Sequence, residues 1–200
     1  MSRSSEKLMR HRLIQAELKM DPLLTDEELS KILGVSISTI RLDRATLGIP
    51  EVRERMRLMA QQALSRLRSL KREEVIGDLV ELDPNRGALS LLTTTPEMAF
   101  RHTELVSDHY IYAQASSLAI AVIEADMVFT GAARLRYRLP AKVGERLVAR
   151  AKVGTRKGNK YVVSVRTSVG DREIFVGRFI TVVGDLESAS RQNGSFHDGR

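Results

Sequence analysis

The segment TDEELSKILGVSISTIRLDR, which begins at Thr25, most constrains how this chain can fold. Thr25 followed three residues later by Glu28 is a capping box, which predicts the start of a helix. Gly34 predicts its end, because glycine adopts the left-handed conformation after a helix at little cost. Ser36 then caps a second helix, which we expect to run to about Leu47. Two short helices joined by a tight turn at a glycine predict a helix-turn-helix.

The second helix of this motif carries side chains suited to the major groove of DNA. Ile40 and Leu47 are expected to point inward, which leaves hydroxyls, cations and apolar groups on the other side. Such groups can contact base edges and thymine methyl groups. The predicted DNA-binding residues are Ser36, Ile37, Ser38, Thr39, Arg41, Leu42 and Arg44. The alternative is an ordinary helical hairpin with a solvated outer face.

The basic residues of the chain are concentrated in its first third. Residues 1–72 contain 15 Lys and Arg and 9 Asp and Glu, a net charge of +6. Residues 73–200 contain 17 and 16, a net charge of +1. The first third would therefore be attracted to a phosphate backbone, which favours double-stranded operator DNA as a partner.

The 200-residue length requires a second domain with its own hydrophobic core. The absence of cysteine excludes disulfides and thiolate chemistry and permits a reducing compartment. The N-terminus lacks the apolar core of a signal peptide, and no apolar run is long enough for a transmembrane helix. We therefore expect a cytoplasmic protein without a membrane partner.

Residues 50–72 form a continuous helical pattern, because apolar residues recur there at steps of three and four. The other side of this helix is rich in arginine. It is expected to link the two domains, and the sequence leaves open whether it packs on a second copy, on its own domain or along phosphates.

After Glu73 the pattern changes to strands, with one helix between the second and the third of them. We expect strands over residues 75–82, 87–92, 127–138, 146–155, 160–169 and 172–183, and a helix from Tyr110 to about Ala125. That helix is apolar on nearly all sides, as a helix enclosed by a sheet must be. The order predicts an α+β chain that ends in a hotdog domain, one helix wrapped by one antiparallel sheet.

The predicted organisation is a helix-turn-helix domain over residues 1–49, a linker helix over 50–72, a hotdog domain over 73–184 and a disordered tail over 185–200. A single sheet leaves exposed edge strands, which pairing of two copies would remove. We therefore expect a homodimer, which also suits a two-fold symmetric DNA site.

The chain resembles the fatty-acid and phospholipid biosynthesis regulators of Gram-positive bacteria. The resemblance lies in these stretches: DEEL at Asp26, GVSI at Gly34, TIRLDR at Thr39, IPE at Ile49, RER at Arg53, EVIG at Glu74, AQA at Ala113, SLA at Ser117, AVI at Ala121, GER at Gly144, VG at Val169 and GRF at Gly177. It implies a repressor that malonyl-CoA or malonyl-acyl carrier protein releases from lipid-synthesis promoters. The ligand would bind in a tunnel of the hotdog dimer, and no other cofactor is expected.

The resemblance also implies a ligand site, from which this sequence departs. Members of the family have an arginine and an asparagine that meet the malonyl carboxylate, and this chain has Ser107 and Ser116 at those positions. Phe100 matches a phenylalanine that moves with the ligand, and His109 lies two residues after the arginine position. A serine hydroxyl is a weaker partner for a carboxylate than a guanidinium. Arg101 or His102 could substitute for it; otherwise the acyl preference could differ or induction could be lost.

An acyl-CoA thioesterase with an appended DNA-binding module is the alternative function. Asp108 and His109 lie near the start of the central helix, where hotdog thioesterases place a catalytic carboxylate. An acidic residue at a helix start is more often a cap, so we expect no enzyme activity. Arg101 and His102 have the same ordinary alternative, an exposed loop pair. The four histidines are too scattered for a metal site.

Overall fold

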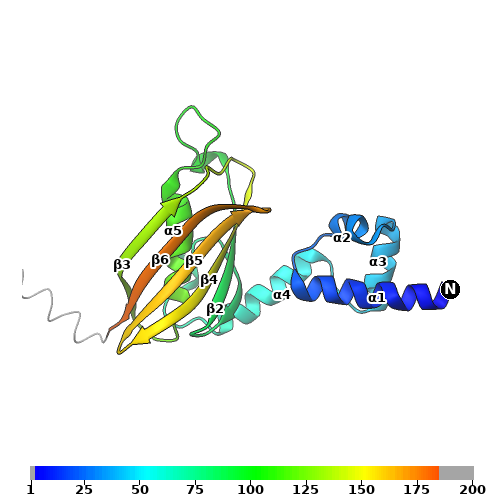
Figure 1. Cartoon of the computed structure of the whole chain (residues 1–200), viewed down its shortest axis with the longest axis horizontal. Helices are drawn as coiled ribbons and strands as arrows, with labels where there is room; N and C mark the ends of the chain where they lie inside the picture. Colours follow the sequence, from blue (N-terminus) through cyan, green and yellow to red (C-terminus); the bar gives the residue numbers. More distant parts are fainter. Residues whose placement is uncertain (1–2, 185–200) are drawn as a thin grey trace, which may run out of the picture. The chain divides into compact units, whose positions relative to one another are not determined.

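The computed structural model describes residues 3–184, so the predicted tail over 185–200 lies outside the described residues. The chain forms two compact units, Met1–Met59 and Ala60–Arg200. We call the first unit the head and the second the body (Figure 1). The boundary between them falls inside one helix, α4. None of the described helices is both long and apolar enough to cross a membrane.

The head contains the predicted helix-turn-helix. Its helices are α1 (Arg3–Met20), α2 (Asp26–Leu33), α3 (Ile37–Thr46) and the first part of α4 (Val52–Ser65). The capping box at Thr25, the left-handed Gly34 with φ of 65° and the Ser36 cap are all present. The side chains of Ile14, Leu29 and Ile40 are fully buried and form the core. Sequence reasoning did not single out α1, which supplies Ile14 to this core.

The linker helix is shorter than the sequence predicts, because α4 ends at Ser65 and does not continue to residue 72. The backbone N–H groups of Arg66 and Leu67 bond to carbonyls three residues back, which closes the last turn. After this turn, Leu67 and Leu70 pack on the core of the body without helical structure. A short 3-10 helix, η1 (Arg72–Glu74), follows.

The body is built on one six-stranded antiparallel sheet with the strand order β1-β2-β4-β5-β6-β3. The strands are β1 (Asp78–Asp83), β2 (Gly87–Thr93), β3 (Val128–Tyr137), β4 (Arg146–Lys157), β5 (Lys160–Val169) and β6 (Arg172–Val183). A second 3-10 helix, η2 (Pro96–Met98), follows β2. Because β1 and β3 are the outer strands, each has one edge that no described strand pairs with.

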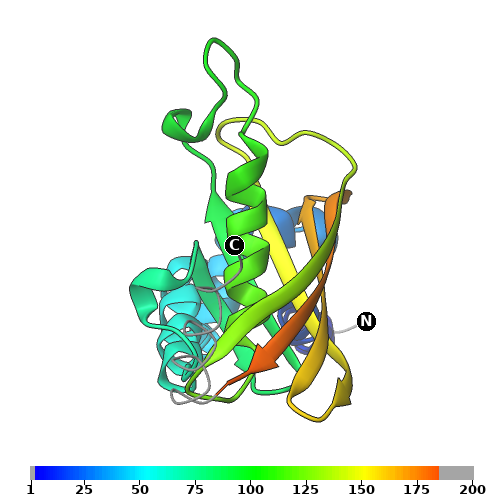
Figure 2. The ribbon, with the colours of Figure 1, turned by 90° about the vertical axis from the view of Figure 1, so that its left-hand side faces the viewer.

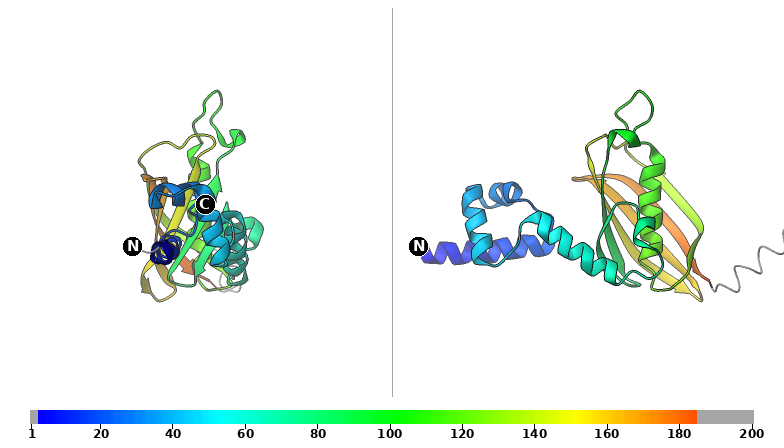
Figure 3. Two further views of the ribbon diagram at one scale, coloured as in Figure 1. Left: turned by 90° about the vertical axis from the view of Figure 1, so that its right-hand side faces the viewer. Right: turned by 180° about the vertical axis from the view of Figure 1, so that it is seen from behind.

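Helix α5 (Asp108–Ala121) lies along the inner face of the sheet (Figures 2 and 3). Leu118 of the helix is fully buried, as are Phe175 and Phe179 of β6. One helix held by one curved antiparallel sheet confirms the predicted α+β chain with a hotdog body. The helix begins two residues earlier than predicted and ends about four residues earlier. Asn85 of the β1–β2 turn meets that end, because its Oδ1 accepts from the Glu124 N–H at 3.1 Å.

Candidate nucleic-acid interface and candidate ligand site

The start of α3 is fixed by hydroxyl groups. The Ser36 Oγ accepts a hydrogen bond from the Thr39 N–H at 3.1 Å. It also lies 2.8 Å from the hydroxyls of Ser38 and Thr39. Ser36 and Thr39, two of the predicted DNA-binding residues, therefore hold the first turn of the helix in place, and Ser38 beside them is exposed.

The outward face of α3 presents a cation next to an apolar group. The Arg41 side chain is 66% exposed and makes only a long contact, 3.5 Å, with the Asp26 carboxylate. Leu42 is 70% exposed, which is a high value for a leucine. Ile37 at the start of the helix is half-buried. A guanidinium, an isobutyl group and the Ser38 hydroxyl suit the edges and methyl groups of bases in a major groove.

The prediction that Arg44 belongs to this exposed face is wrong. Arg44 is only 4% exposed. Its Nε and Nη2 donate to the two carboxylate oxygens of Asp26 at 2.6 and 2.8 Å, and its Nη1 donates to the Ile49 carbonyl at 3.0 Å. These hydrogen bonds lower the pKa of Asp26 and raise that of Arg44. Arg44 thus ties α3 to the first turn of α2 and to the segment before α4.

A second buried carboxylate attaches α3 to α1. Asp43 is 2% exposed and accepts from the Arg10 Nε at 2.5 Å, while its other oxygen lies 2.9 Å from the His11 Nε2. Burial alone would raise the pKa of Asp43, but the bonds from Arg10 and His11 outweigh it and lower that pKa. Sequence reasoning missed this cluster, because Asp43 is more than 30 residues away from Arg10 and His11 in the sequence.

Arg55 holds the first turn of α4 to the head. Its guanidinium donates to the carbonyl oxygens of Pro22, Leu24 and Pro50 at 3.1, 2.6 and 2.6 Å. Burial lowers the pKa of Arg55. The side chain was predicted only as part of a basic helix face. Because the Arg55 guanidinium donates to three backbone carbonyls of the head, the head sets the direction in which α4 begins.

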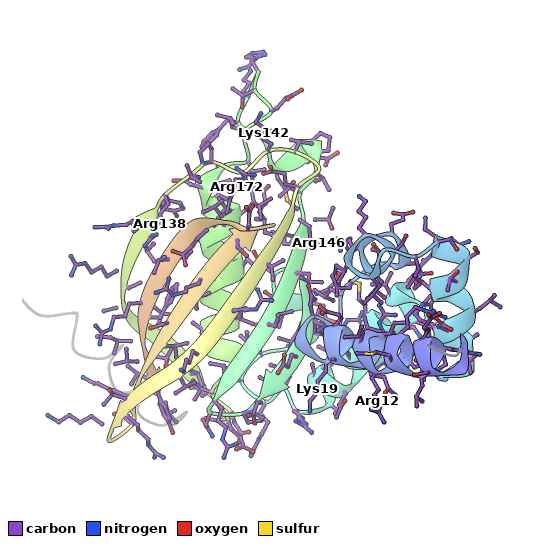
Figure 4. The ribbon with its side chains drawn as sticks, turned by 45° about the vertical axis from the view of Figure 1, so that its right-hand side comes forward. Arg12, Lys19, Arg138, Lys142, Arg146 and Arg172 are labelled. Atoms are coloured by element: carbon purple, nitrogen blue, oxygen red, sulfur yellow. The ribbon has the colours of Figure 1, made fainter. Side chains whose placement is uncertain are left out.

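Further cations lie on the surface of α1. Arg12 and Lys19 are exposed and are seven residues apart, so they share one side of the helix (Figure 4). Two turns of helix separate them by about 10 Å. Together with Arg41 they make the surface of the head more positive. A surface that binds phosphates needs such positive charge.

The candidate ligand site lies at the N-terminus of α5. Ser107 is the N-cap residue and is 7% exposed, and its N–H donates to the Met98 carbonyl at 2.8 Å. Its Oγ lies 2.7 Å from the Nδ1 of His109, whose ring packs against that of Tyr110 with centroids 4.1 Å apart and planes tilted by 36°. The structure therefore brings Ser107 and His109 together as a hydrogen-bonded pair.

The loop before α5 carries the other predicted side chains. It projects beyond the N-terminal end of the helix (Figure 2) and is closed by a bridge between Ala99 and Val106. Phe100 is 49% exposed, and Arg101 and His102 are exposed as well. His102 has a φ of 63°, the left-handed region that few residues other than glycine adopt. Within one chain these three side chains are turned to solvent.

Ser116 does not join Ser107 within one chain. Nine residues separate the two serines on α5, which is two and a half turns of helix. They therefore lie on opposite sides of the helix and about 13.5 Å apart along its axis. A ligand that meets both positions would need Ser116 from a second copy of the chain.

Gln114 is a buried polar residue of α5 to which sequence reasoning assigned no role. It is 0% exposed, and its Nε2 donates at 3.2 Å to both the carbonyl oxygen and the Oγ of Ser90 on β2. These bonds fasten the middle of α5 to the sheet. The sequence feature that could have revealed this role is a single glutamine within a helix of otherwise apolar and small residues.

The thioesterase alternative finds little support at Asp108. Its side chain is exposed, and its backbone carbonyl accepts a hydrogen bond of 3.4 Å from the Tyr137 hydroxyl. Among the described residues, the Asp108 carboxylate has no hydrogen-bond partner that would orient it toward a thioester. No three acidic or histidine side chains of residues 3–184 gather to hold a metal ion.

Solved structures resemble the chain in fold. Cj0977, a sigma28-regulated virulence protein from Campylobacter jejuni, aligns with a TM-score of 0.59 and 25% identity over 66% of this chain and 92% of its own. The uncharacterized protein PH1136 from Pyrococcus horikoshii aligns with a TM-score of 0.55 and 27% identity, covering 60% and 92%.

No protein-family model matches the chain. Curated relatives match nearly all of it. The Transcription factor FapR of Thermoanaerobacter sp. strain X514 is 43% identical over 187 residues, 94% of each chain. That of Geobacillus thermodenitrificans is 40% identical over 191 residues, 94% of this chain and 96% of the relative. That of Bacillus velezensis is 42% identical over 173 residues, covering 85% and 92%. With the helix-turn-helix and the hotdog body both in place, these identities show that the chain belongs to the FapR family of transcription factors.

Proposed function

We propose that this chain is a cytoplasmic, homodimeric repressor of fatty acid and phospholipid synthesis genes. Malonyl-CoA or malonyl-acyl carrier protein bound in the hotdog body would release it from operator DNA. The observation that carries the DNA-binding part is the outward face of α3, where Arg41 and Leu42 are exposed at 66% and 70% beside Ser38. Neither side chain contributes to the core of the head, so both are available to read bases.

Pairing of two copies through β3 would form the homodimer. The exposed edge of β3 offers a row of unpaired backbone groups, and a second copy would satisfy them. Pairing would also bring Ser107 of one copy and Ser116 of the other within reach of a single ligand, which one chain alone does not do. A two-fold dimer presents two α3 helices to the two halves of an operator.

The ligand can release DNA only if it binds the DNA-incompetent arrangement more tightly than the competent one. A coupling free energy of about 1–3 kcal/mol is typical of such switches. In this chain the Ser107 hydroxyl, paired with the His109 imidazole at 2.7 Å between Oγ and Nδ1, takes the position where a guanidinium would meet the malonyl carboxylate. Arg101, which is exposed in the loop before α5, is the nearby side chain that could supply the missing charge.

A gel-shift assay with a lipid-synthesis promoter fragment tests the proposal. Arg41→Ala should weaken specific binding by about 5- to 150-fold, since a bidentate base contact contributes about 1–3 kcal/mol. Arg86→Ala, which removes an exposed arginine of the body, is the matched control and should leave binding unchanged. Malonyl-CoA should dissociate the wild-type complex and acetyl-CoA should not. Equal binding by Arg41→Ala, or a complex that persists in saturating malonyl-CoA, would contradict the respective part of the proposal.

A further inference from the structure

The outer face of the sheet, turned away from α5, carries two rows of cations. Side chains alternate along β6, so that Arg178 is exposed between the buried residues Gly177 and Phe179. Cross-strand pairing places Arg134 of β3 beside Arg178, and further along the same row Ser164 of β5 beside Lys152 of β4. The next row runs Arg136, Val176, Arg166 and Arg150. Paired residues lie on the same face of a sheet, so all these side chains point outward.

This concentration of arginine and lysine side chains on one face contrasts with the small net charge of the second part of the chain. Residues 73–200 carry a net charge of only +1. The one carboxylate that we find on this face of β3 to β6 is Glu173, which Arg138 and Arg166 both hold, at 3.0 and 2.6 Å. The acidic residues Glu81 and Asp83 lie at the far end of the face, on β1. The face is therefore strongly basic at the β3 end and acidic at the β1 end.

A hollow of about 370 Å³ lies at the basic end. It is lined by Arg134, Leu135, Arg136, Arg138, Val176 and Arg178. Among residues 3–184, no carboxylate oxygen lies within 4.0 Å of the guanidinium groups of Arg134, Arg136 or Arg178. Arg138 lies just beyond the end of β3 (Figure 4). Like charges held this close repel one another, and a bound anion would remove that repulsion.

We propose that this arginine hollow binds a small ligand of the nucleotide class that carries two or more phosphate groups. Guanidinium groups bind phosphate in a bidentate manner, and four of them around one hollow match several phosphate oxygens. The aliphatic side chain of Val176, which lies in the row between Arg136 and Arg166, offers an apolar surface for the nucleoside. Duplex DNA fits less well, because its continuous backbone would run toward the carboxylates of Glu81 and Asp83 on the same face.

The site does not depend on the proposed effector response. Pairing of two copies through β3 would use backbone groups in the plane of the sheet and leave the outward arginine side chains exposed. The hollow is also formed by one chain alone, in contrast to the ligand position between Ser107 and Ser116.

Titration calorimetry of the full chain with pyrophosphate and with ADP, at about 0.15 M salt, tests this assignment. The double variant Arg134→Ala/Arg178→Ala should bind ADP at least about tenfold more weakly than wild type. Arg150→Ala/Lys152→Ala removes the same charge from the same face outside the hollow, and its affinity should change by less than about twofold. Arg134→Lys/Arg178→Lys keeps the charge but loses the bidentate geometry and should be intermediate. Tighter binding of ADP than of pyrophosphate would support the nucleotide class.

Three results would overturn the assignment. The first is absence of binding of both probes to the wild-type chain. The second is an equal loss of affinity in the two alanine variants, because it would reduce the site to general surface charge. The third is unchanged ADP binding together with weakened operator binding in Arg134→Ala/Arg178→Ala, which would assign the face to the DNA backbone. A thermal melt of each variant checks that the sheet has kept its stability.

Discussion

Arg41 and Arg44 are three residues apart on α3 but differ in burial and in their contacts with Asp26. Arg44 is 4% exposed and satisfies both oxygens of Asp26, whereas Arg41 touches that carboxylate only at 3.5 Å. Arg44→Met leaves the Asp26 charge without its main partner, and we expect the free energy of unfolding of the head to fall by about 2–4 kcal/mol. Arg41→Met, the matched control, should change it by less than about 0.5 kcal/mol. Urea denaturation followed by circular dichroism measures both.

Acid should lower the free energy of unfolding of the head, because it protonates Asp26 and Asp43. The Arg44 hydrogen bond lowers the pKa of Asp26, and the Arg10 and His11 bonds lower that of Asp43 against the effect of burial. A lowered pKa stabilises the folded state above the unfolded value of about 3.9, and this stability is lost as the pH falls below that value. Asp43→Asn should therefore be less stable than wild type at neutral pH and show a shallower loss in acid. Thermal melts across acidic pH measure this, and parallel profiles would rule out a role for Asp43.

At the scale of the element, α3 separates a core face from an exposed face. Ile40 is fully buried and Leu42, two residues later, is 70% exposed. We expect Ile40→Ala to destabilise the head by about 2–5 kcal/mol, because it leaves a cavity in a small core. Leu42→Ala should leave stability unchanged within about 0.5 kcal/mol and weaken operator binding. Thermal denaturation and a gel shift on the same two variants measure these effects. A stability loss in Leu42→Ala would instead make that side chain part of the fold.

The elements that local chemistry determines were predictable, and those set by distant contacts were not. The caps at Thr25, Gly34 and Ser36 act within four residues, so the sequence places α2 and α3 closely. The end of α4 was missed because Leu67 and Leu70 fit an apolar helical stripe and an extended segment on the body equally well. Burial of Arg44 depends on Asp26, 18 residues away in the sequence.

Sequence motifs predict which residues form the candidate ligand site but not how their side chains are arranged. Matching motifs place Ser107, His109 and Ser116 on one helix. The periodicity of that helix puts Ser107 and Ser116 on opposite sides, and the hydrogen bond between Ser107 and His109 depends on side-chain orientations that a pattern does not define. The arginine hollow was missed as well, because its residues gather only when β3 pairs with β6.

For the whole molecule, a ligand-released repressor must obey reciprocity between its two ligands. If malonyl-CoA lowers the affinity for operator DNA by some factor, bound operator must lower the affinity for malonyl-CoA by the same factor. A coupling of about 1–3 kcal/mol corresponds to a factor of roughly 5–150. Titration calorimetry of malonyl-CoA into the free chain and into the chain saturated with operator measures one factor, and gel shifts with and without malonyl-CoA measure the other.

The Arg41→Ala variant is the control for the comparison of malonyl-CoA affinities with and without operator. Because Arg41 belongs to the head and the proposed ligand site belongs to the body, the variant should bind malonyl-CoA as wild type does when no DNA is present. In the presence of operator at a concentration that saturates only the wild type, its malonyl-CoA affinity should stay at the free value, while that of the wild type falls. Equal malonyl-CoA affinities for the wild type with and without operator would mean that the two sites are not coupled. The hotdog body would then bind its ligand without acting on the DNA-reading helix.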